Sequence, residues 1–155
     1  WVKTSNTEGI IEEVGLRSTK IRTFEKTLIT IPNSKVADSV IENVSERQMR
    51  KHSFVLGLSY GTSPDKMKKA LNAIQEILAS REEIFQDENM VFFTDFGQSA
   101  LEILVKYVTT CTAGPEHFRV RETVNLTIME KLAELGVEIA FPSTSVYIEK
   151  MPGKR

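Results

Sequence analysis

The chain has 155 residues, of which 41% are hydrophobic, enough to fill the core of one ordinary domain or of two small ones. Twenty Lys and Arg stand against 21 Asp and Glu, so the chain lacks the basic excess that drives binding to a phosphate backbone, and we expect no nucleic-acid partner. A single cysteine, Cys111, excludes an internal disulfide, and with two histidines the sequence offers no metal-type cluster, so we expect no cofactor.

The longest uninterrupted apolar runs, such as residues 90–93, are far shorter than the roughly 18 to 20 residues that cross a bilayer. The chain begins with Trp1, and its first residues are typical of the end of a strand and not of a signal peptide. We therefore expect a segment of a longer protein that does not itself span a membrane.

Residues 1–50 are rich in β-branched side chains and show no helical periodicity, which predicts a domain of short strands. Strands are predicted over residues 10–16, 20–24 and 27–31, and the last two should form a hairpin. Because Glu25 and Lys26 are not an Asn-Gly or Asp-Gly pair, its loop should be slightly longer than a tight turn. Residues 32–34 are predicted to break the strand, with another short strand over residues 40–44.

The pattern changes after a polar and basic segment, so we place a domain boundary after residue 50 and a second domain over residues 51–149. A strand is predicted from Phe54 to Tyr60, followed by a helix with its N-cap at Ser63 that runs to about Ser80. A hairpin over residues 91–96 and 101–109, a second helix from Gly114 to Gly136 and a strand over residues 137–141 come next. A final strand lies before a polar tail, residues 150–155.

The order β-α-β-β-α-β indicates the ferredoxin-like split unit, an α+β sheet with two helices on one face. One further strand, which includes Val146, Tyr147 and Ile148, exceeds what that unit needs. An unpaired strand has an open edge that is normally covered or paired, so we expect it to pair with another chain.

Several side chains carry specific expectations. Alternation assigns Phe92 and Phe96 to one face of their strand and Phe93 to the other. Neither histidine has ligand-like spacing, so both are expected at a surface or an interface, and Cys111 is expected to be inert. The second helix should point the following residues inward: Phe118, Val124, Ile128, Leu132 and Leu135.

Three ordered stretches closely resemble the β-domain of the small-conductance mechanosensitive channel family, MscS: Gly9 to Thr23, Leu28 to Lys35 (LITIPNSK) and Ile41 to Ser45 (IENVS). The resemblance continues through the basic residues 47–52 and the β-α-β-β-α-β region to Phe141-Pro142 and the terminal strand. It therefore covers nearly the whole chain.

This resemblance implies a non-enzymatic subunit of a homo-oligomeric channel, typically a ring of seven identical subunits. The chain would be its cytoplasmic part at the inner membrane, an Sm-like β domain with an incomplete first strand followed by the αβ domain. Pore helices upstream of Trp1 would sense tension, and the soluble domains would enclose a vestibule through which ions and small solutes pass.

The resemblance also implies roles for individual residues. The segment Pro32, Asn33, Ser34 and Lys35 corresponds to a loop near the base of the pore helices, where we expect coupling to gating. Val146, Tyr147 and Ile148 would contribute to a small barrel at the base of the cage. Three basic residues at the domain junction could line side portals and attract anions, with a solvated basic linker as the alternative: Arg47, Arg50 and Lys51.

Two other functions remain open from the sequence. The first is a free-standing ferredoxin-like module that binds a small ligand or acts as a hydrolase. It would need an anion-binding loop with an arginine, and none accompanies Gly57 and Gly61. The second is an Sm-like RNA-binding ring, which a nearly neutral chain hardly supports.

Overall fold

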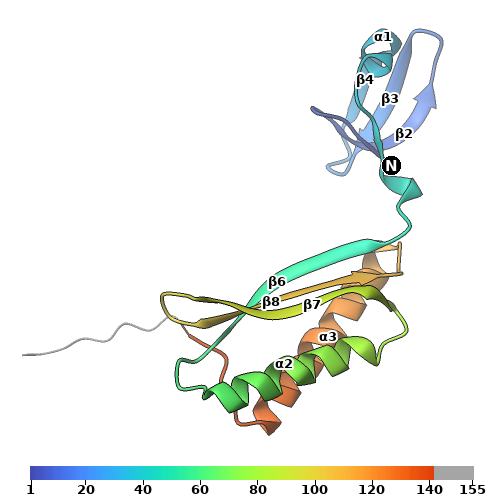
Figure 1. The fold of residues 1–155 in the computed structure, drawn as a ribbon. Helices are drawn as coiled ribbons and strands as arrows, with labels where there is room; N and C mark the ends of the chain where they lie inside the picture. The colour runs from blue at the N-terminus through green and yellow to red at the C-terminus, as the bar shows by residue number, and fades with distance from the viewer. Residues whose placement is uncertain (142–155) are drawn as a thin grey trace, which may run out of the picture. The chain divides into compact units, whose positions relative to one another are not determined.

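The computed structural model describes residues 1–141 and divides the chain into two compact units, Trp1–Gln48 and a second that begins at Met49 (Figure 1). The first unit is mostly β-structure and the second combines three strands with two long helices. Elements of the first unit are β1 (Val2–Lys3), β2 (Glu8–Val14), β3 (Ser18–Thr23), β4 (Leu28–Pro32), α1 (Asn33–Ala37), β5 (Glu42–Asn43) and the 3-10 turn η1 (Val44–Glu46).

The first unit is an antiparallel sheet with the strand order β4-β3-β2-β1-β5. Its buried side chains include Val2, Thr19, Ile21 and Val44. The predicted strands agree closely with β2, β3 and β4. Two details differ from expectation: residues 33–37 form the short helix α1 instead of a turn, and the predicted strand over residues 40–44 is reduced to β5 followed by η1.

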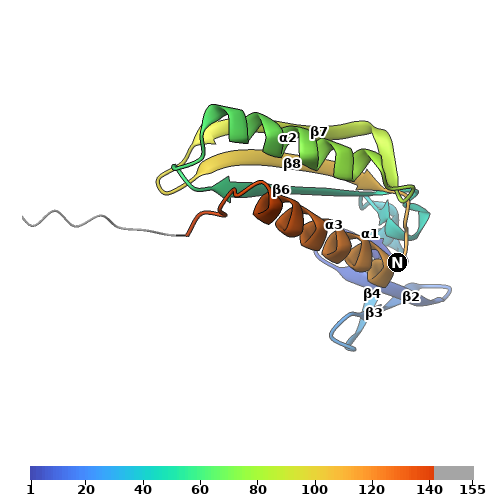
Figure 2. The same cartoon turned by 90° about the horizontal axis from the view of Figure 1, so that it is seen from below.

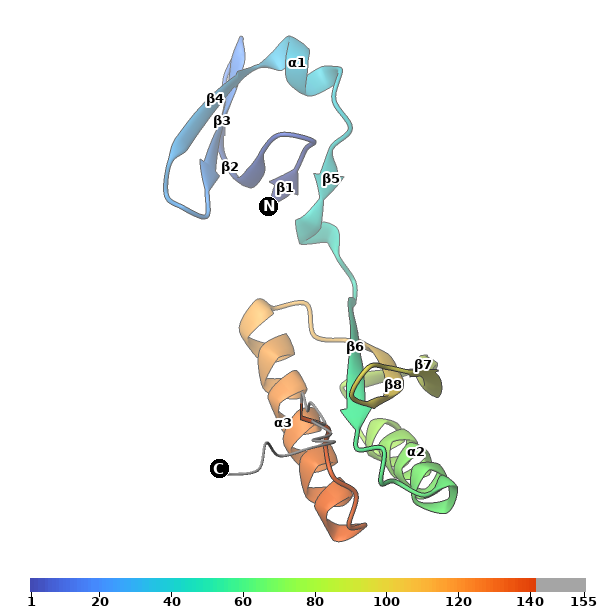
Figure 3. The same cartoon turned by 90° about the vertical axis from the view of Figure 1, so that its left-hand side faces the viewer.

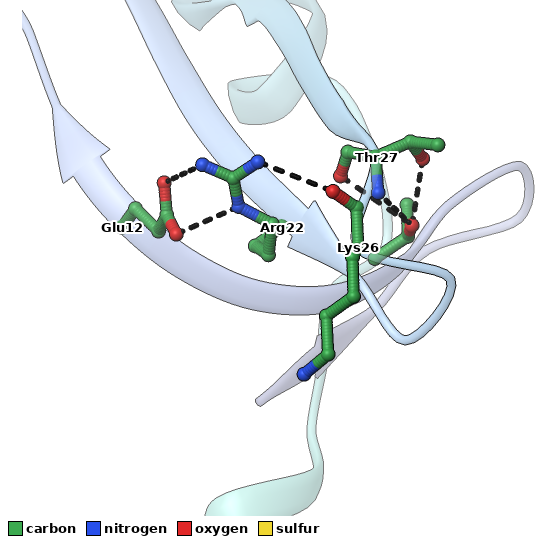
Figure 4. A network of polar contacts seen from close by, with 5 residues as sticks. Glu12, Arg22, Lys26 and Thr27 are labelled. Atoms are coloured by element: carbon green, nitrogen blue, oxygen red, sulfur yellow. Dashed lines mark hydrogen bonds and ion pairs between the residues drawn. The ribbon is translucent and has the colours of Figure 1, made fainter.

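The β3–β4 hairpin turns through residues 24–27, which confirms the expected longer loop. Lys26 has a positive φ of 68°. Its carbonyl accepts a 3.2 Å hydrogen bond from Arg22 Nη1, while Arg22 also binds both carboxylate oxygens of Glu12, at 2.8 and 3.0 Å (Figure 4). The guanidinium holds the pKa of Glu12 below its ordinary value. These bonds tie the turn to the neighbouring strand.

The second unit is a sheet with the order β6-β8-β7 and two helices packed on one of its faces (Figures 2 and 3). The order of its elements is the predicted one. The structure bounds them as β6 (Arg50–Leu58), α2 (Pro64–Ala79), β7 (Ile84–Phe96), β8 (Leu101–Thr109) and α3 (Gly114–Glu134).

The predicted strand over residues 137–141 is reduced to one antiparallel bridge, Leu58 with Ile139. Ser59 N donates to the carbonyl of Glu138 and Ala140 N donates to that of Gly57, both at 2.9 Å. The bridge keeps the chain beside β6, where the fourth strand of a ferredoxin-like sheet lies. The prediction of a full strand here is wrong, because Ile139 alone among residues 137–141 is bridged to β6.

The core of the second unit lies between the sheet and the helices. Leu58, Ile103 and Tyr107 from the sheet are fully buried there, together with Ile74, Leu78, Val124 and Leu132 from the helices. Burial raises the pKa of Tyr107 to about 12, and its hydroxyl has no hydrogen-bond partner among residues 1–141.

Two side-chain predictions in this unit are wrong. Phe118 is 60% exposed and His117 is buried instead, because the inward stripe of α3 passes through residues 117, 120, 124, 128 and 132. Phe96 lies against Phe93, with ring centroids 5.0 Å apart, and not on the face of Phe92. A register shift between Phe93 and Asp95 reverses the alternation there.

Candidate functional site

The first candidate site is the segment from Pro32 to Lys35, at the end of β4. Pro32 ends the strand, and Asn33 begins α1 and forms three hydrogen bonds of 2.9 Å. Its Oδ1 accepts from Thr19 Oγ1, its Nδ2 donates to the carbonyl of Gly15, and its backbone N donates to the carbonyl of Arg17. Asn33 therefore fastens the start of α1 to the β2–β3 hairpin.

Beyond Asn33, most of α1 is exposed, while Val36 is half-buried. None of the helix residues is fully buried, and Ser34 and Lys35 are exposed. Beneath the helix is a cavity of about 140 Å³ whose lining includes Ile21, Ile31 and Val36. The segment thus presents a hydroxyl and an ammonium group from a firmly attached base, an arrangement suited to contact with a partner.

We expect Asn33→Ala to lower the free energy of unfolding of the first unit by about 1 to 2 kcal/mol, because the buried Thr19 hydroxyl would lose its acceptor. Denaturant unfolding followed by fluorescence of the single tryptophan, Trp1, measures the change. Ser34→Ala removes an exposed polar group from the next position and should leave the midpoint nearly unchanged. Equal midpoints for the two variants would contradict the anchoring role.

The three basic residues at the junction do not form one cluster. Arg47 lies with its guanidinium 5.6 Å from the centre of the Trp1 ring, in the first unit. Arg50 and Lys51 belong to β6, which begins four residues before the predicted strand, and Arg50 Nε donates to the carbonyl of Thr112 at 2.8 Å. Lys51 is exposed. Arg50 and Lys51 are thus part of a strand and not of a linker.

A groove of about 340 Å³ lies between β6 and α3 and was not predicted from the sequence. His52 lines it and stacks on Phe54, with the ring centroids 5.3 Å apart. Burial, and then the nearby charges of Arg121 and His117, lower the pKa of His52. His117, expected at a surface or interface, is buried and lies 2.8 Å from Thr109 Oγ1 through its Nδ1.

The lowered pKa of His52 predicts a pH effect on the second unit. Since the unfolded chain takes up a proton at a higher pH than the folded chain, stability should fall as the pH drops below about 6.5, the ordinary histidine pKa. His52→Phe keeps the stacking and removes the titration. Between pH 7.5 and pH 5.5 its melting temperature should fall less than that of the wild type, and parallel curves would contradict the assignment.

Val146, Tyr147 and Ile148 and the polar tail lie outside the described residues. Near Gly61, Lys66 Nζ donates to the carbonyl of Gly136 at 2.6 Å and joins the start of α2 to the end of α3. No helix within residues 1–141 is long and apolar enough to cross a membrane, and those residues hold no metal-type group of His, Cys, Asp and Glu.

Comparison with protein families matches residues 1–46 to the mechanosensitive ion channel beta-domain and residues 52–139 to the C-terminal domain of the mechanosensitive ion channel MscS. An uncharacterized MscS family protein of Aquifex aeolicus is 41% identical, over 97% of this chain and 41% of its own length. The small-conductance mechanosensitive channel MscMJ of Methanocaldococcus jannaschii is 40% identical, over 97% of this chain and 43% of its own length. The chain spans about two-fifths of these curated relatives.

Solved structures have the same fold. MscS of Helicobacter pylori in its closed state aligns with a TM-score of 0.76 and 26% identity, over 97% of this chain and 58% of that chain. MSL1 of Arabidopsis thaliana aligns with a TM-score of 0.82 and 23% identity, over 91% of this chain and 51% of that chain. The resemblance carried by residues 9–45 is thereby confirmed, and the chain belongs to the MscS family of mechanosensitive ion channels.

Proposed function

We propose that this chain is the cytoplasmic part of a mechanosensitive channel subunit, held at the cytoplasmic face of the inner membrane by pore helices outside residues 1–155. A ring of seven identical subunits would enclose a vestibule below the pore, through which ions and small solutes leave the cell under osmotic stress. No bond is made or broken. The observation that carries the proposal is the match of two channel domain models in order along the chain, over residues 1–46 and 52–139.

Exposed apolar side chains of the first unit support assembly with identical subunits. Leu16 is fully exposed, Val40 is 89% exposed, and Val14 and Phe24 are 70% and 55% exposed. Val14 and Leu16 are two positions apart at the β2–β3 turn, and exposed apolar groups that lie together are typical of a contact surface. A subunit contact would bury part of this surface.

The segment from Pro32 to Lys35 would couple this domain to the base of the pore helices. Asn33 is fixed by its three hydrogen bonds, so a contact made by Ser34 or Lys35 would transmit force to the β2–β3 hairpin. The resulting bias between open and closed states can be no larger than the difference in contact free energy between them.

Of the three basic residues Arg47, Arg50 and Lys51, the two arginines would line side portals and raise the local anion concentration, while Lys51 lies farther along β6. Residues 146–148 would join their counterparts in a barrel at the base of the cage. Deletion of residues 145–155 should then weaken assembly. Native mass spectrometry that finds unchanged oligomers would contradict the barrel.

Patch recording on the full-length protein, produced in a cell that lacks its own mechanosensitive channels, tests the function directly. Tension-evoked current is expected, and its absence would contradict the proposal. For the coupling segment, Lys35→Glu should shift the tension threshold. Lys26→Glu makes the same charge change in the turn at the other end of the β3–β4 hairpin and should leave the threshold unchanged.

The alternative of a free-standing ligand-binding module or hydrolase gains little support. Its anion site would need a cation free to bind a substrate beside Gly61. The amine that lines the cavity there, on Lys66, is already bound to the carbonyl of Gly136.

A further inference from the structure

The sheet of the second unit has an edge along β6 that the described residues leave largely unpaired. The carbonyl of Gly57 accepts a hydrogen bond from Ala140, so the backbone groups of Gly57 face this edge. Because alternate residues of a strand direct their backbone groups to the same side, those of Lys51, Ser53 and Val55 face the edge as well. All three residues are exposed.

Two cations lie along this edge without an acidic partner among residues 1–141. Lys51 is exposed on the strand itself. Arg121 reaches the adjoining groove from α3, beside His52 and Asn125. Its guanidinium carbon is 5.2 Å from the centre of the Phe118 ring, and its buried Nε has no hydrogen-bond partner in the described part of the chain. The β6 edge is therefore positively charged, and the described residues leave both cations without an ion pair and Arg121 Nε without a hydrogen bond.

The opposite edge of the same sheet is acidic. Between Phe85 and Met90 the register of β7 against β8 shifts, and residues 86–89 bulge out of the ladder. Gln86 Nε2 donates to three carbonyl groups at the end of α2 and the start of β7, and Asn89 donates to Gln86 Oε1 at 3.1 Å. Asp87 and Glu88 are exposed on this fixed bulge and form no ion pair within residues 1–141.

The two edges carry their charges at the same height along the strands. Lys51 and Phe85 both pair with Val108 of β8, and His52 pairs with Tyr107, the next residue toward the bulge. The acidic bulge falls between Phe85 and Met90, so it lies level with Lys51 and His52 on the other side of the sheet.

We infer that neighbouring copies of this chain meet head to tail through these edges, with Asp87 and Glu88 of one copy against Lys51 and Arg121 of the next. If copies of the chain are related by rotation about an axis parallel to the strands, each charged group keeps its level along that axis. The acidic edge of one copy then meets the basic edge of the next at the same level, and repeated contacts of this kind can close a ring. The bulge and its charges oppose continuous strand pairing, so the contact is made by side chains. The inference rests on the proposed assembly of identical subunits and names its surface.

Cysteine cross-linking of the full-length protein in membranes tests the geometry. In a Cys111→Ser background, the pair Lys51→Cys and Glu88→Cys should give a ladder of multimers with a short bis-maleimide, while each cysteine alone should give monomers. Cross-linking by either single variant would indicate a two-fold contact and overturn the inference. Monomers from the pair would overturn it as well, and neither result bears on whether tension evokes a current.

Charge reversal tests the energetics. Arg121→Glu should weaken assembly at least about tenfold, measured by native mass spectrometry across a concentration series, because like charges then face each other. Adding Glu88→Arg should restore it, which a folding defect would not allow. Arg119→Glu makes the same change at an exposed position of α3 and should have little effect. Equal losses for Arg119→Glu and Arg121→Glu, or no rescue, would overturn the pairing.

Discussion

Ile103→Ala is expected to lower the free energy of unfolding of the second unit by about 3 to 5 kcal/mol. Ile103 lies in the central strand β8, paired with Leu56 on one side and Phe93 on the other, and none of its surface reaches water. Removal of its side chain would leave a cavity between the sheet and the helices. Urea unfolding followed by circular dichroism at a helical wavelength measures the loss, because α2 and α3 carry most of the helix.

Leu104→Ala is the matched control, since Leu104 is the next residue of β8 and points to the other face of the sheet. It is only partly buried, so its loss should be less than half as large. The Trp1 fluorescence transition, which reports the first unit, should be unchanged in both variants. Equal losses at the two positions would contradict a sheet covered by helices on one face.

Elements defined by local signals could be predicted from the sequence. Ser63, Pro64 and Asp65 provide an N-cap, a proline in the first turn and an acid there, and α2 begins at Pro64. The alternation over residues 101–109 likewise predicts β8 with its bounds. Both signals lie within the element itself, so no distant contact was needed to interpret them.

Features that depend on register or helix phase could not be predicted. The register of β7 against β8 shifts by one residue between Phe93 and Asp95, and this shift places Phe96 on the helix-covered face of the sheet. Nothing in the sequence indicates the shift. In α3, hydrophobicity favours Phe118 over its neighbour. The helix instead buries His117, whose ring nitrogen meets Thr109 in β8, a partner visible only once the strand is placed.

The candidate sites show the same limit. The sequence marks residues 32–35 through resemblance, but the partners of Asn33 lie at residues 15, 17 and 19 and become apparent only in the folded hairpin. Arg121 was missed because it is 70 positions from Lys51. A sequence signal did exist: Arg121 is four positions after His117, so helical spacing places it beside the buried stripe of α3.

Gly9→Ala should destabilise the first unit by about 3 kcal/mol, at the upper end of the usual cost of overpacking. Gly9 is buried in β2 and pairs with Val2 on one side and Thr23 on the other. A Cβ there would overlap the backbone carbonyl of Arg22 and come within 2.8 Å of the Ile21 side chain. Since a carbonyl in a strand cannot rotate away, the β2–β3 ladder itself would have to shift.

The Trp1 fluorescence transition measures this loss, because its ring packs against Phe24 of the same unit, with centroids 5.1 Å apart. Gly114→Ala is the control, since a Cβ at Gly114 would meet no atom within 4 Å and alanine favours the helix that begins there. That variant should be neutral or slightly stabilising by circular dichroism. An unchanged fluorescence midpoint for Gly9→Ala would contradict the close contact between Gly9 of β2 and the backbone of Arg22 in β3.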